Sequence, residues 1–342
     1  MVGLLSVFPL FFAPIQDDPV EYSFAFFGCN RVDKSDWDIT TNPSSANLPQ
    51  LRQSFLDISQ IKPMPKLLFM TGDLVLGYGD DKGEEVRKQL DGWIAEYRKS
   101  PLEGKIEMVP MSGNHEMNRK VKEERMASLY TTEVWNDWLR TNKLPPLNPN
   151  GPKAGPTDDL VDDQSLLNFS FDRGNFHFTC LNTDTRTTDG RIGYIPSTWA
   201  KTDIDKATKE GKTIFVLGHR NVVDGTSAKG DAPIEPKSGG ELVKAMHASP
   251  NVVGYLCAHV HAWDVSKVNG EMPWQVIAGN GGSKLEKDWK PEGGTTYGFA
   301  VIEVHKSGKI VLVPYFRKAD DKAPVEPAKP APAIELGMTK VG

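Results

Sequence analysis

The segment KLLFMTGD, residues 66–73, places a short apolar strand directly before a glycine and an aspartate. The same arrangement, an apolar strand followed by small and polar residues, recurs in FAFFGCNR (24–31), EMVPMSGNHE (107–116), IFVLGHR (214–220) and GYLCAHVH (254–261). In a largely parallel sheet the carboxyl ends of the strands meet at one edge, and α/β proteins bind their ligands there. We therefore expect these five strand ends to form one site.

Segments with helical spacing separate these strands, so the first half of the chain alternates between strand and helix. The second half is richer in strands, with a hairpin predicted to turn at residues 173–175 and antiparallel pairs expected. This pattern predicts an α/β protein in which one two-sheet domain, residues 20–318, accounts for the strands better than two domains do. Helices are predicted over residues 48–60, 84–99, 119–140, 197–210 and 240–247.

The composition excludes several classes of protein. With 39% hydrophobic and 25% charged residues among 342, the chain can bury a sizeable core and is neither collagen-like nor wholly disordered. Forty Lys and Arg residues against 45 Asp and Glu residues give a net charge of −5, so we expect no nucleic-acid partner. Three cysteines cannot all pair within one chain, and no disulfide framework is predicted.

The two ends of the chain differ from the domain between them. Residues 1–19 begin with an apolar stretch that has the length of a signal-peptide core, although no Lys or Arg precedes it. We interpret them as a signal peptide or an N-terminal segment and expect a periplasmic or secreted protein, with a cytoplasmic location as the alternative. Residues 319–342, rich in Pro and Ala, are predicted to be a disordered tail. No segment has the length of a membrane span.

The side chains delivered by the strand ends are those that bind transition metals. They are Cys29, Asp73, Asn114, His115, His219, His259 and His261. These positions take four of the seven histidines in the chain, which argues against chance. Imidazole, carboxylate and amide groups together suit ions of the Mn, Fe, Co or Zn type. A carboxylate can also bridge two ions about 3.5 to 4 Å apart, and Asp73 is the natural bridge.

The order Gly-Asp, Gly-Asn-His-Glu, Gly-His and His-x-His resembles that of the calcineurin-like metallophosphoesterases, which include the purple acid phosphatases, over residues 24–316. The resemblance implies a four-layer αββα sandwich, in which two mixed β-sheets pack face to face and are flanked by helices. It also implies a dinuclear metal centre, and we expect this chain to hold one or two metal ions. The implied function is hydrolysis of a small-molecule phosphate ester, a monoester or a diester, by a metal-bound hydroxide.

Carried over residue by residue, the resemblance makes Asp73 the bridging ligand, with Asn114, His219 and His259 completing one metal site. The family's other site normally takes an Asp-x-His motif, the bridging aspartate and the second histidine of the last motif, here His261. Where Asp-x-His would fall, this chain has Cys29, an asparagine and an arginine.

Three interpretations of this departure remain open. Cys29 can bind a metal as a thiolate, which resembles the alkaline phosphatase D type. Alternatively the second site is empty and one ion suffices, or the protein is catalytically impaired and binds a phosphorylated ligand or partner.

Three further side chains are candidate catalytic groups. Arg31 stays protonated in any protein, so it can repel a second cation, grip a phosphate oxygen or form a salt bridge. Arg220, beside His219, has the same alternatives. His115 resembles the family's histidine that contacts phosphate or protonates the leaving oxygen, whereas Glu116 is expected to orient its loop.

Overall fold

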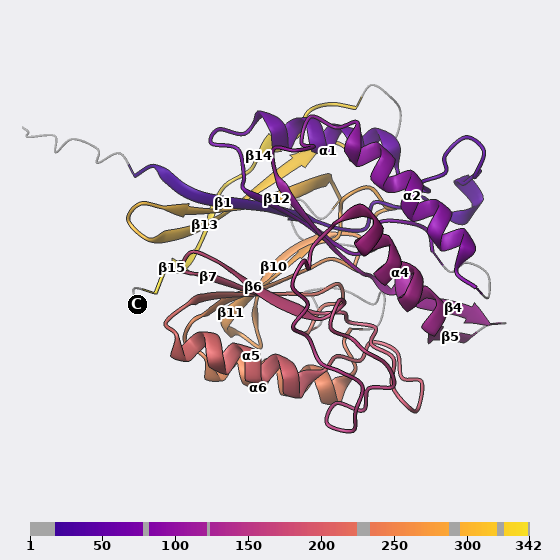
Figure 1. The fold of residues 1–342 in the computed structure, drawn as a ribbon. Helices are drawn as coiled ribbons and strands as arrows, with labels where there is room; N and C mark the ends of the chain where they lie inside the picture. The colour runs from indigo at the N-terminus through magenta and orange to yellow at the C-terminus, as the bar shows by residue number, and fades with distance from the viewer. Residues whose placement is uncertain are drawn as a thin grey trace, which may run out of the picture.

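The computed structural model describes residues 18–77, 82–121, 124–223, 233–286, 295–319 and 325–340. In this part of the chain, two mixed β-sheets pack face to face and helices cover both outer sides (Figure 1). This is the four-layer arrangement expected for the fold. Residues 1–17 of the leader, which is predicted over residues 1–19, lie outside the described residues. Within the described residues, no helix combines the length and apolar character needed to cross a bilayer.

The first sheet has the order β14-β13-β12-β1-β2-β3, with β15 paired to β13. Its central strands β1, β2 and β3 run parallel, whereas β12 and β13 are antiparallel to their neighbours. The strands are β1 (Val20–Phe27), β2 (Leu67–Thr71), β3 (Glu107–Met111), β12 (Tyr297–His305), β13 (Lys309–Arg317), β14 (Lys329–Pro330) and β15 (Ile334–Met338).

The second sheet has the order β10-β11-β9-β8-β7-β6, parallel from β11 to β7 and antiparallel at both edges. The predicted hairpin turn joins β6 to β7. The strands are β6 (Phe169–Arg173), β7 (Phe176–Cys180), β8 (Thr213–Leu217), β9 (Val252–Cys257), β10 (Trp263–Val268) and β11 (Glu271–Ala278).

Helices α1, α2 and α4 lie on the outer side of the first sheet, and α5 and α6 on the outer side of the second (Figure 1). The observed helices are α1 (Leu48–Gln60), α2 (Glu84–Arg98), α4 (Leu129–Asn142), α5 (Ser197–Lys209) and α6 (Pro236–Ala248). Each corresponds to a predicted helix, and only the helix predicted over residues 119–140 differs substantially from the observed one. Two short helices, η1 (Lys34–Asp36) and α3 (Asn114–Met117), follow strands β1 and β3.

The central strands are largely apolar and are buried on both faces: β2, β7, β8 and β9 are buried along their whole length. In β1, Phe24 and Phe26 pack between the two sheets, while Ala25 and Phe27 pack under the helices. Strands covered on both faces have near-continuous apolar sequences rather than an alternating pattern. Both sheets are therefore rigid supports for the residues that follow their strands.

Two predictions about local structure were wrong. The prediction of one helix over residues 119–140 fails at its start, where β4 (Asn118–Val121) and β5 (Glu124–Ala127) form a hairpin. The backbone N–H of Ser128 donates to the carbonyl oxygen of Met117 at 3.1 Å, which closes the hairpin before α4 begins.

The second correction concerns the predicted disordered tail, because residues 325–340 are ordered and β15 adds to the edge of β13. Leu336 is buried, and its carbonyl oxygen accepts a hydrogen bond of 3.0 Å from Nε1 of Trp274. The folded unit therefore extends beyond residue 318.

His177 on β7 joins the second sheet to α5 through two carboxylates. Its Nδ1 lies 2.7 Å from Oδ1 of Asp172 and its Nε2 lies 2.9 Å from Oδ2 of Asp203. Because both ring nitrogens face acceptors, the charged ring is favoured. Burial lowers the pKa of His177, but hydrogen bonds and attraction from Asp203 and Asp172 outweigh burial and raise it.

A raised pKa makes this contact stabilising at low pH. The contribution of His177 is present in full below its unfolded-state pKa and is lost as the pH rises through its folded-state pKa. We expect His177→Gln to lower the free energy of unfolding by about 1 to 3 kcal/mol at pH 6, and by less at pH 8.5. Urea unfolding at both pH values measures this, with the exposed His247→Gln as control. An equal loss at both pH values would contradict the charged ring.

Candidate metal centre

The predicted site residues follow strands of both sheets. Cys29 follows β1, Asp73 follows β2, Asn114 follows β3, His219 follows β8 and His259 follows β9. Backbone hydrogen bonds link these strand ends, including one of 2.9 Å from the Cys29 N–H to the Gly72 carbonyl oxygen. The centre therefore lies at the carboxyl edge of β1, β2 and β3, where the two sheets meet.

Three of these residues have a strained backbone. Cys29, Asp73 and His259 have φ angles of 55°, 54° and 63°, in the left-handed region that residues other than glycine rarely adopt. Such conformations persist only where the surrounding structure imposes them, and they concentrate at functional sites. Here the strain turns each side chain sharply at the end of its strand.

The Nε2 atom of His219 is the point on which the other ligands converge. It lies 3.1 Å from Oδ1 of Asp73, 3.1 Å from Oδ1 of Asn114 and 3.2 Å from Nδ1 of His259. Ligand atoms that share one ion at about 2.1 Å are themselves separated by roughly 3 to 3.5 Å. The three atoms therefore lie at this spacing from Nε2 of His219, whereas the group of His, Cys, Asp and Glu ligand atoms that all lie within 4.8 Å of one another is, among the described residues, Cys29, Asp73 and His219, without His259.

The hydrogen-bonding groups around His219 favour a positive charge at this point. Its Nδ1 faces the carbonyl oxygen of Thr71 at 2.8 Å, so Nδ1 carries the proton of a neutral ring and Nε2 has a lone pair. Two oxygen acceptors and Nδ1 of His259 surround that lone pair, and a proton on Nε2 or a bound metal ion would stabilise the two oxygen contacts. Burial lowers the pKa of His219, but the Asp73 carboxylate outweighs burial and raises it.

Glu116 supports its own loop, as the sequence predicted, and it also supports the loop of Asp73. Its carboxylate accepts hydrogen bonds from the backbone N–H groups of Gly113 (2.7 Å), Asp73 (3.0 Å) and Val75 (3.0 Å). Burial raises the pKa of Glu116 to about 7, and the nearby negative charge of Asp73 adds to this effect. Glu116 therefore positions the backbone and does not face the metal ligands.

Cys29 lies within the same centre. A ligand atom from each of Cys29, Asp73 and His219 lies within 4.8 Å of the other two, and all three residues are buried. Burial raises the pKa of the Cys29 thiol, and the Asp73 charge raises it further, whereas a hydrogen bond to the His259 backbone lowers it. A metal ion would be needed to hold this group as a thiolate.

His261 is not part of that group of three. Its Nδ1 lies 2.9 Å from the carbonyl oxygen of Lys284, so the neutral ring keeps its proton on Nδ1 and its lone pair on Nε2. This tautomer suits a metal ligand, and the ring is near enough to His259 and His115 to lower the pKa of both.

His115 faces the outer side of Asp73. Its Nε2 lies 3.8 Å from Oδ2 of Asp73, and its Nδ1 contacts the carbonyl oxygen of Leu76. Burial lowers the pKa of His115 to about 3, and the charge of Arg31 also lowers it, so the ring is neutral at physiological pH.

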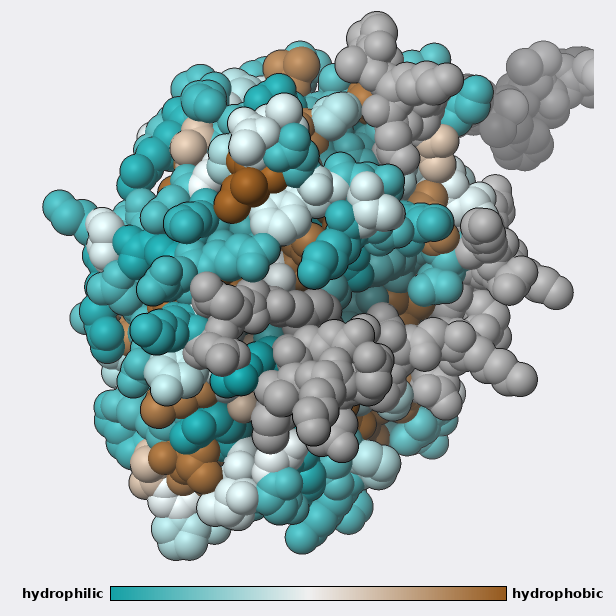
Figure 2. Space-filling view, turned by 90° about the vertical axis from the view of Figure 1, so that its right-hand side faces the viewer, coloured by the Kyte–Doolittle hydropathy of each residue, from teal (hydrophilic) through white to brown (hydrophobic). Residues whose placement is uncertain are grey.

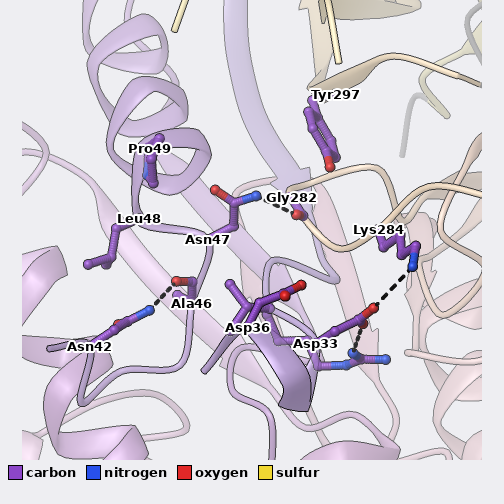
Figure 3. Close-up of a pocket in the computed structure, with 12 residues that line it drawn as sticks. Asp33, Asp36, Asn42, Ala46, Asn47, Leu48, Pro49, Gly282, Lys284 and Tyr297 are labelled. Carbon is purple, nitrogen blue, oxygen red and sulfur yellow. Dashed lines mark hydrogen bonds and ion pairs between the residues drawn. The ribbon is translucent and has the colours of Figure 1, made fainter. Parts of the chain in front are cut away.

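Arg31 joins the centre to a neighbouring pocket of about 510 Å³, which this residue helps to line. Its Nε lies 3.8 Å from Oδ2 of Asp73, and its Nη1 lies 3.4 Å from Oδ1 of Asp33. Asp33 also pairs with Nζ of Lys284 at 3.7 Å, and Figure 3 shows this pair at the pocket. The face in Figure 2, the right-hand side of Figure 1, is largely hydrophilic where its residues are described.

Of the alternatives left open for Arg220, the structure shows the salt bridge. Its Nε and Nη2 each donate to the carboxylate of Asp184 at 2.9 Å, and both side chains are buried. Its Nη1 donates to Nε2 of His259 at 3.1 Å, so the neutral His259 ring carries its proton on Nδ1. An ion bound at Nδ1 would displace that proton. Arg220 is thus a positioning residue behind His259.

Asp184 was missed by the sequence analysis. It follows β7, in the run LNTD that comes directly after the apolar strand, and so repeats the pattern of the other site residues. Its Oδ1 also accepts a hydrogen bond of 2.9 Å from Nδ2 of Asn118, which ties β4 to the centre.

The profile of one protein family matches most of this chain. The sequence profile of the calcineurin-like phosphoesterases matches residues 35–263, about two thirds of the chain. That range contains five of the six predicted metal ligands and leaves out Cys29. A search of curated protein sequences found no match.

Several solved structures share the fold at low sequence identity. A purple acid phosphatase from yellow lupin (Lupinus luteus) seeds is 16% identical with a TM-score of 0.57, over 90% of this chain and 53% of that one. A dimetal phosphatase from Danio rerio is 10% identical with a TM-score of 0.58, over 94% of this chain and 100% of that one. GAP50, the anchor in the inner membrane complex of Plasmodium, is 13% identical with a TM-score of 0.53, over 94% of this chain and 90% of that one.

Proposed function

The chain belongs to the calcineurin-like phosphoesterase family, and from this premise we propose that it hydrolyses phosphate esters of small molecules with a bound divalent metal ion. The observation that carries the proposal is the convergence of three ligand atoms, from Asp73, Asn114 and His259, on Nε2 of His219. Asp73, Asn114, His219 and His259 would hold the ion.

A metal ion in this centre supplies a Lewis acid that activates water near neutral pH and neutralises phosphate oxygens. Imidazole, carboxylate and amide ligands favour an ion of the Mn, Fe, Zn or Co type. The protein contributes a buried, rigid setting in which attraction between the centre and an anionic phosphate is weakly screened.

His115 and Arg31 both face Oδ2 of Asp73, and Arg31 also lines the pocket, so we assign them to the substrate. Arg31 would hold a phosphate oxygen through its guanidinium, in the charge-assisted manner typical of arginine. His115 is neutral in the absence of a ligand, and an approaching phosphate dianion would favour its protonated form. That form could donate a proton to the leaving oxygen.

The second candidate is a catalytically impaired protein that binds a phosphorylated ligand or partner in the same centre. The observation that favours it is the pair Cys29 and Arg31, which stand where the family's Asp-x-His motif would fall. GAP50, which has a similar fold, is described as the anchor in the inner membrane complex of Plasmodium and not as an enzyme.

The test of the proposed function compares hydrolysis and metal content in one preparation. Protein purified without chelators and reloaded with Mn²⁺ or Zn²⁺ is assayed on a panel of phosphate monoesters and diesters. We expect hydrolysis that stops when a chelator removes the ion and returns when the ion is restored. His115→Asn is expected to lower kcat by about 10² to 10³ fold while metal content stays unchanged.

The exposed His247→Asn serves as the matched control and should leave both kcat and metal content unaltered. Bound metal and tight binding of inorganic phosphate, with no hydrolysis of any ester, would instead favour the binding protein. Absence of bound metal under all loading conditions would contradict the proposed function.

A further inference from the structure

The two carboxylate oxygens of Asp73 face different partners. Oδ1 faces Nε2 of His219 at 3.1 Å and accepts a hydrogen bond of 3.1 Å from the backbone N–H of His115. Oδ2 faces the guanidinium Nε of Arg31 at 3.8 Å and Nε2 of His115 at the same distance. Oδ1 therefore faces His219, whereas Oδ2 faces His115 and the permanent positive charge of Arg31.

A bridging carboxylate serves two metal ions by giving one oxygen to each, with the ions about 3.5 to 4 Å apart. An ion about 2.1 Å from Oδ2 of Asp73 would lie roughly 2 to 6 Å from Nε of Arg31, because Nε is itself 3.8 Å from that oxygen. A divalent ion and a guanidinium this close repel each other strongly in a buried site. Arginine cannot lose its proton to relieve the repulsion.

Arg31 is fixed in this position. Its side chain is 11% exposed, Nη1 is paired with Asp33, and its backbone bridges to Ala46 across the loop. Nε is buried and makes no hydrogen bond to any residue that the structure describes. A buried N–H donor without an acceptor is costly, and an anionic oxygen placed between Arg31 and the centre would satisfy it.

We propose that this centre binds one divalent ion and that Arg31 supplies the second positive charge, a claim that rests on the proposed function and specifies it. The ion would occupy the site of Asp73, Asn114, His219 and His259. A phosphate group would then be held between that ion and the guanidinium of Arg31, a residue that lines the 510 Å³ pocket. The protein therefore selects anions that can contact both.

The experiment counts ions in the wild-type chain and in variants that remove the guanidinium. Apo-protein is titrated with Mn²⁺ alone, and bound ions are counted by calorimetry and by mass spectrometry. We expect one ion per wild-type chain and an electron paramagnetic resonance signal of isolated Mn²⁺. In Arg31→His, which replaces the cation with a ligand, we expect two ions and the signal of a coupled pair.

A second variant covers the case in which the Cys29 thiol prevents the Arg31→His chain from binding a second ion. Cys29→Asp combined with Arg31→His supplies both a carboxylate and an imidazole and should also bind two ions. Arg52→His on the exposed side of α1 is the matched control and should still bind one. Circular dichroism establishes that each variant is folded.

The outcomes separate this inference from the function on which it rests. Two ions in the wild-type chain would overturn the inference while leaving a metal-dependent hydrolase intact. One ion in both the single and the double variant would also overturn it, because Arg31 would not be what excludes the second ion. No ion in the wild-type chain would overturn the proposed function itself.

Binding of inorganic phosphate tests the second half of the proposal. With the chain loaded with Mn²⁺, Arg31→Gln is expected to weaken phosphate binding by at least about tenfold, because a charge-assisted hydrogen bond is lost. Arg31→Lys retains the charge and should recover part of that loss. Equal phosphate affinity in the wild type and Arg31→Gln would show that the guanidinium does not hold the anion.

Discussion

Replacing Asp73 by asparagine is expected to lower phosphate-ester hydrolysis by at least about 10³ fold and to lower metal affinity in parallel. The substitution keeps the shape of the side chain but removes the one negative charge that faces His219 at 3.1 Å. A proton on His219 is then no longer stabilised, and the metal ion loses its anionic ligand. Metal content by mass spectrometry and kcat/KM on the best ester of the panel measure the two effects.

The loss should be specific to the centre and should not reflect unfolding. Burial raises the pKa of Asp73, yet the nearby His219 and His115 rings hold it well below its ordinary value, so a charged carboxylate is buried there. Removing it relieves a desolvation cost and offsets part of the lost attraction. We expect a thermal unfolding midpoint within a few degrees of wild type, and no effect from the exposed Asp137→Asn. Retained metal and activity in Asp73→Asn would exclude this carboxylate from the centre.

The site was predictable from the sequence where side chains directly follow strands. Asp73, Asn114, His219 and His259 were found because each comes one to three residues after an apolar run, and parallel strands bring such positions to one edge. The pairing of Arg220 was not predictable. Whether an arginine faces a substrate or a buried carboxylate depends on which loops meet in space, and that is decided by packing of the two sheets.

The fold was predictable to the extent that its strands are continuous apolar runs. The two wrong predictions concern strands that are ordered by pairing with neighbouring segments more than by their own apolar pattern. β15 carries a short apolar alternation of Ile334, Leu336 and Met338 next to a segment rich in Pro and Ala, and it is ordered by pairing with the edge of β13. The β4–β5 hairpin likewise depends on a closing hydrogen bond between Ser128 and Met117.

Gly113→Ala is expected to disable the centre although it adds only a methyl group. The new Cβ would lie 2.3 Å from Oδ1 of Asp73 and 3.0 Å from Cε1 of His219, closer than real Cβ contacts allow. The backbone angles of Gly113, φ −108° and ψ −177°, suit alanine, so the effect comes from the clash alone. We expect metal affinity and kcat/KM each to fall by about 10² fold, the size of effect that a displacement near 1 Å produces.

Gly240→Ala provides the matched control, because its added Cβ meets no atom within 4 Å on helix α6. There the same chemical change should raise the free energy of unfolding by about 0.5 to 1 kcal/mol and leave metal binding intact. Overpacking at Gly113 costs about 1 to 3 kcal/mol, so that variant should still fold at room temperature. A folded Gly113→Ala chain with wild-type metal affinity would mean that Asp73 can move without consequence. The ion would then not depend on the tight spacing of Asp73 and His219, and the four-ligand assignment would fail.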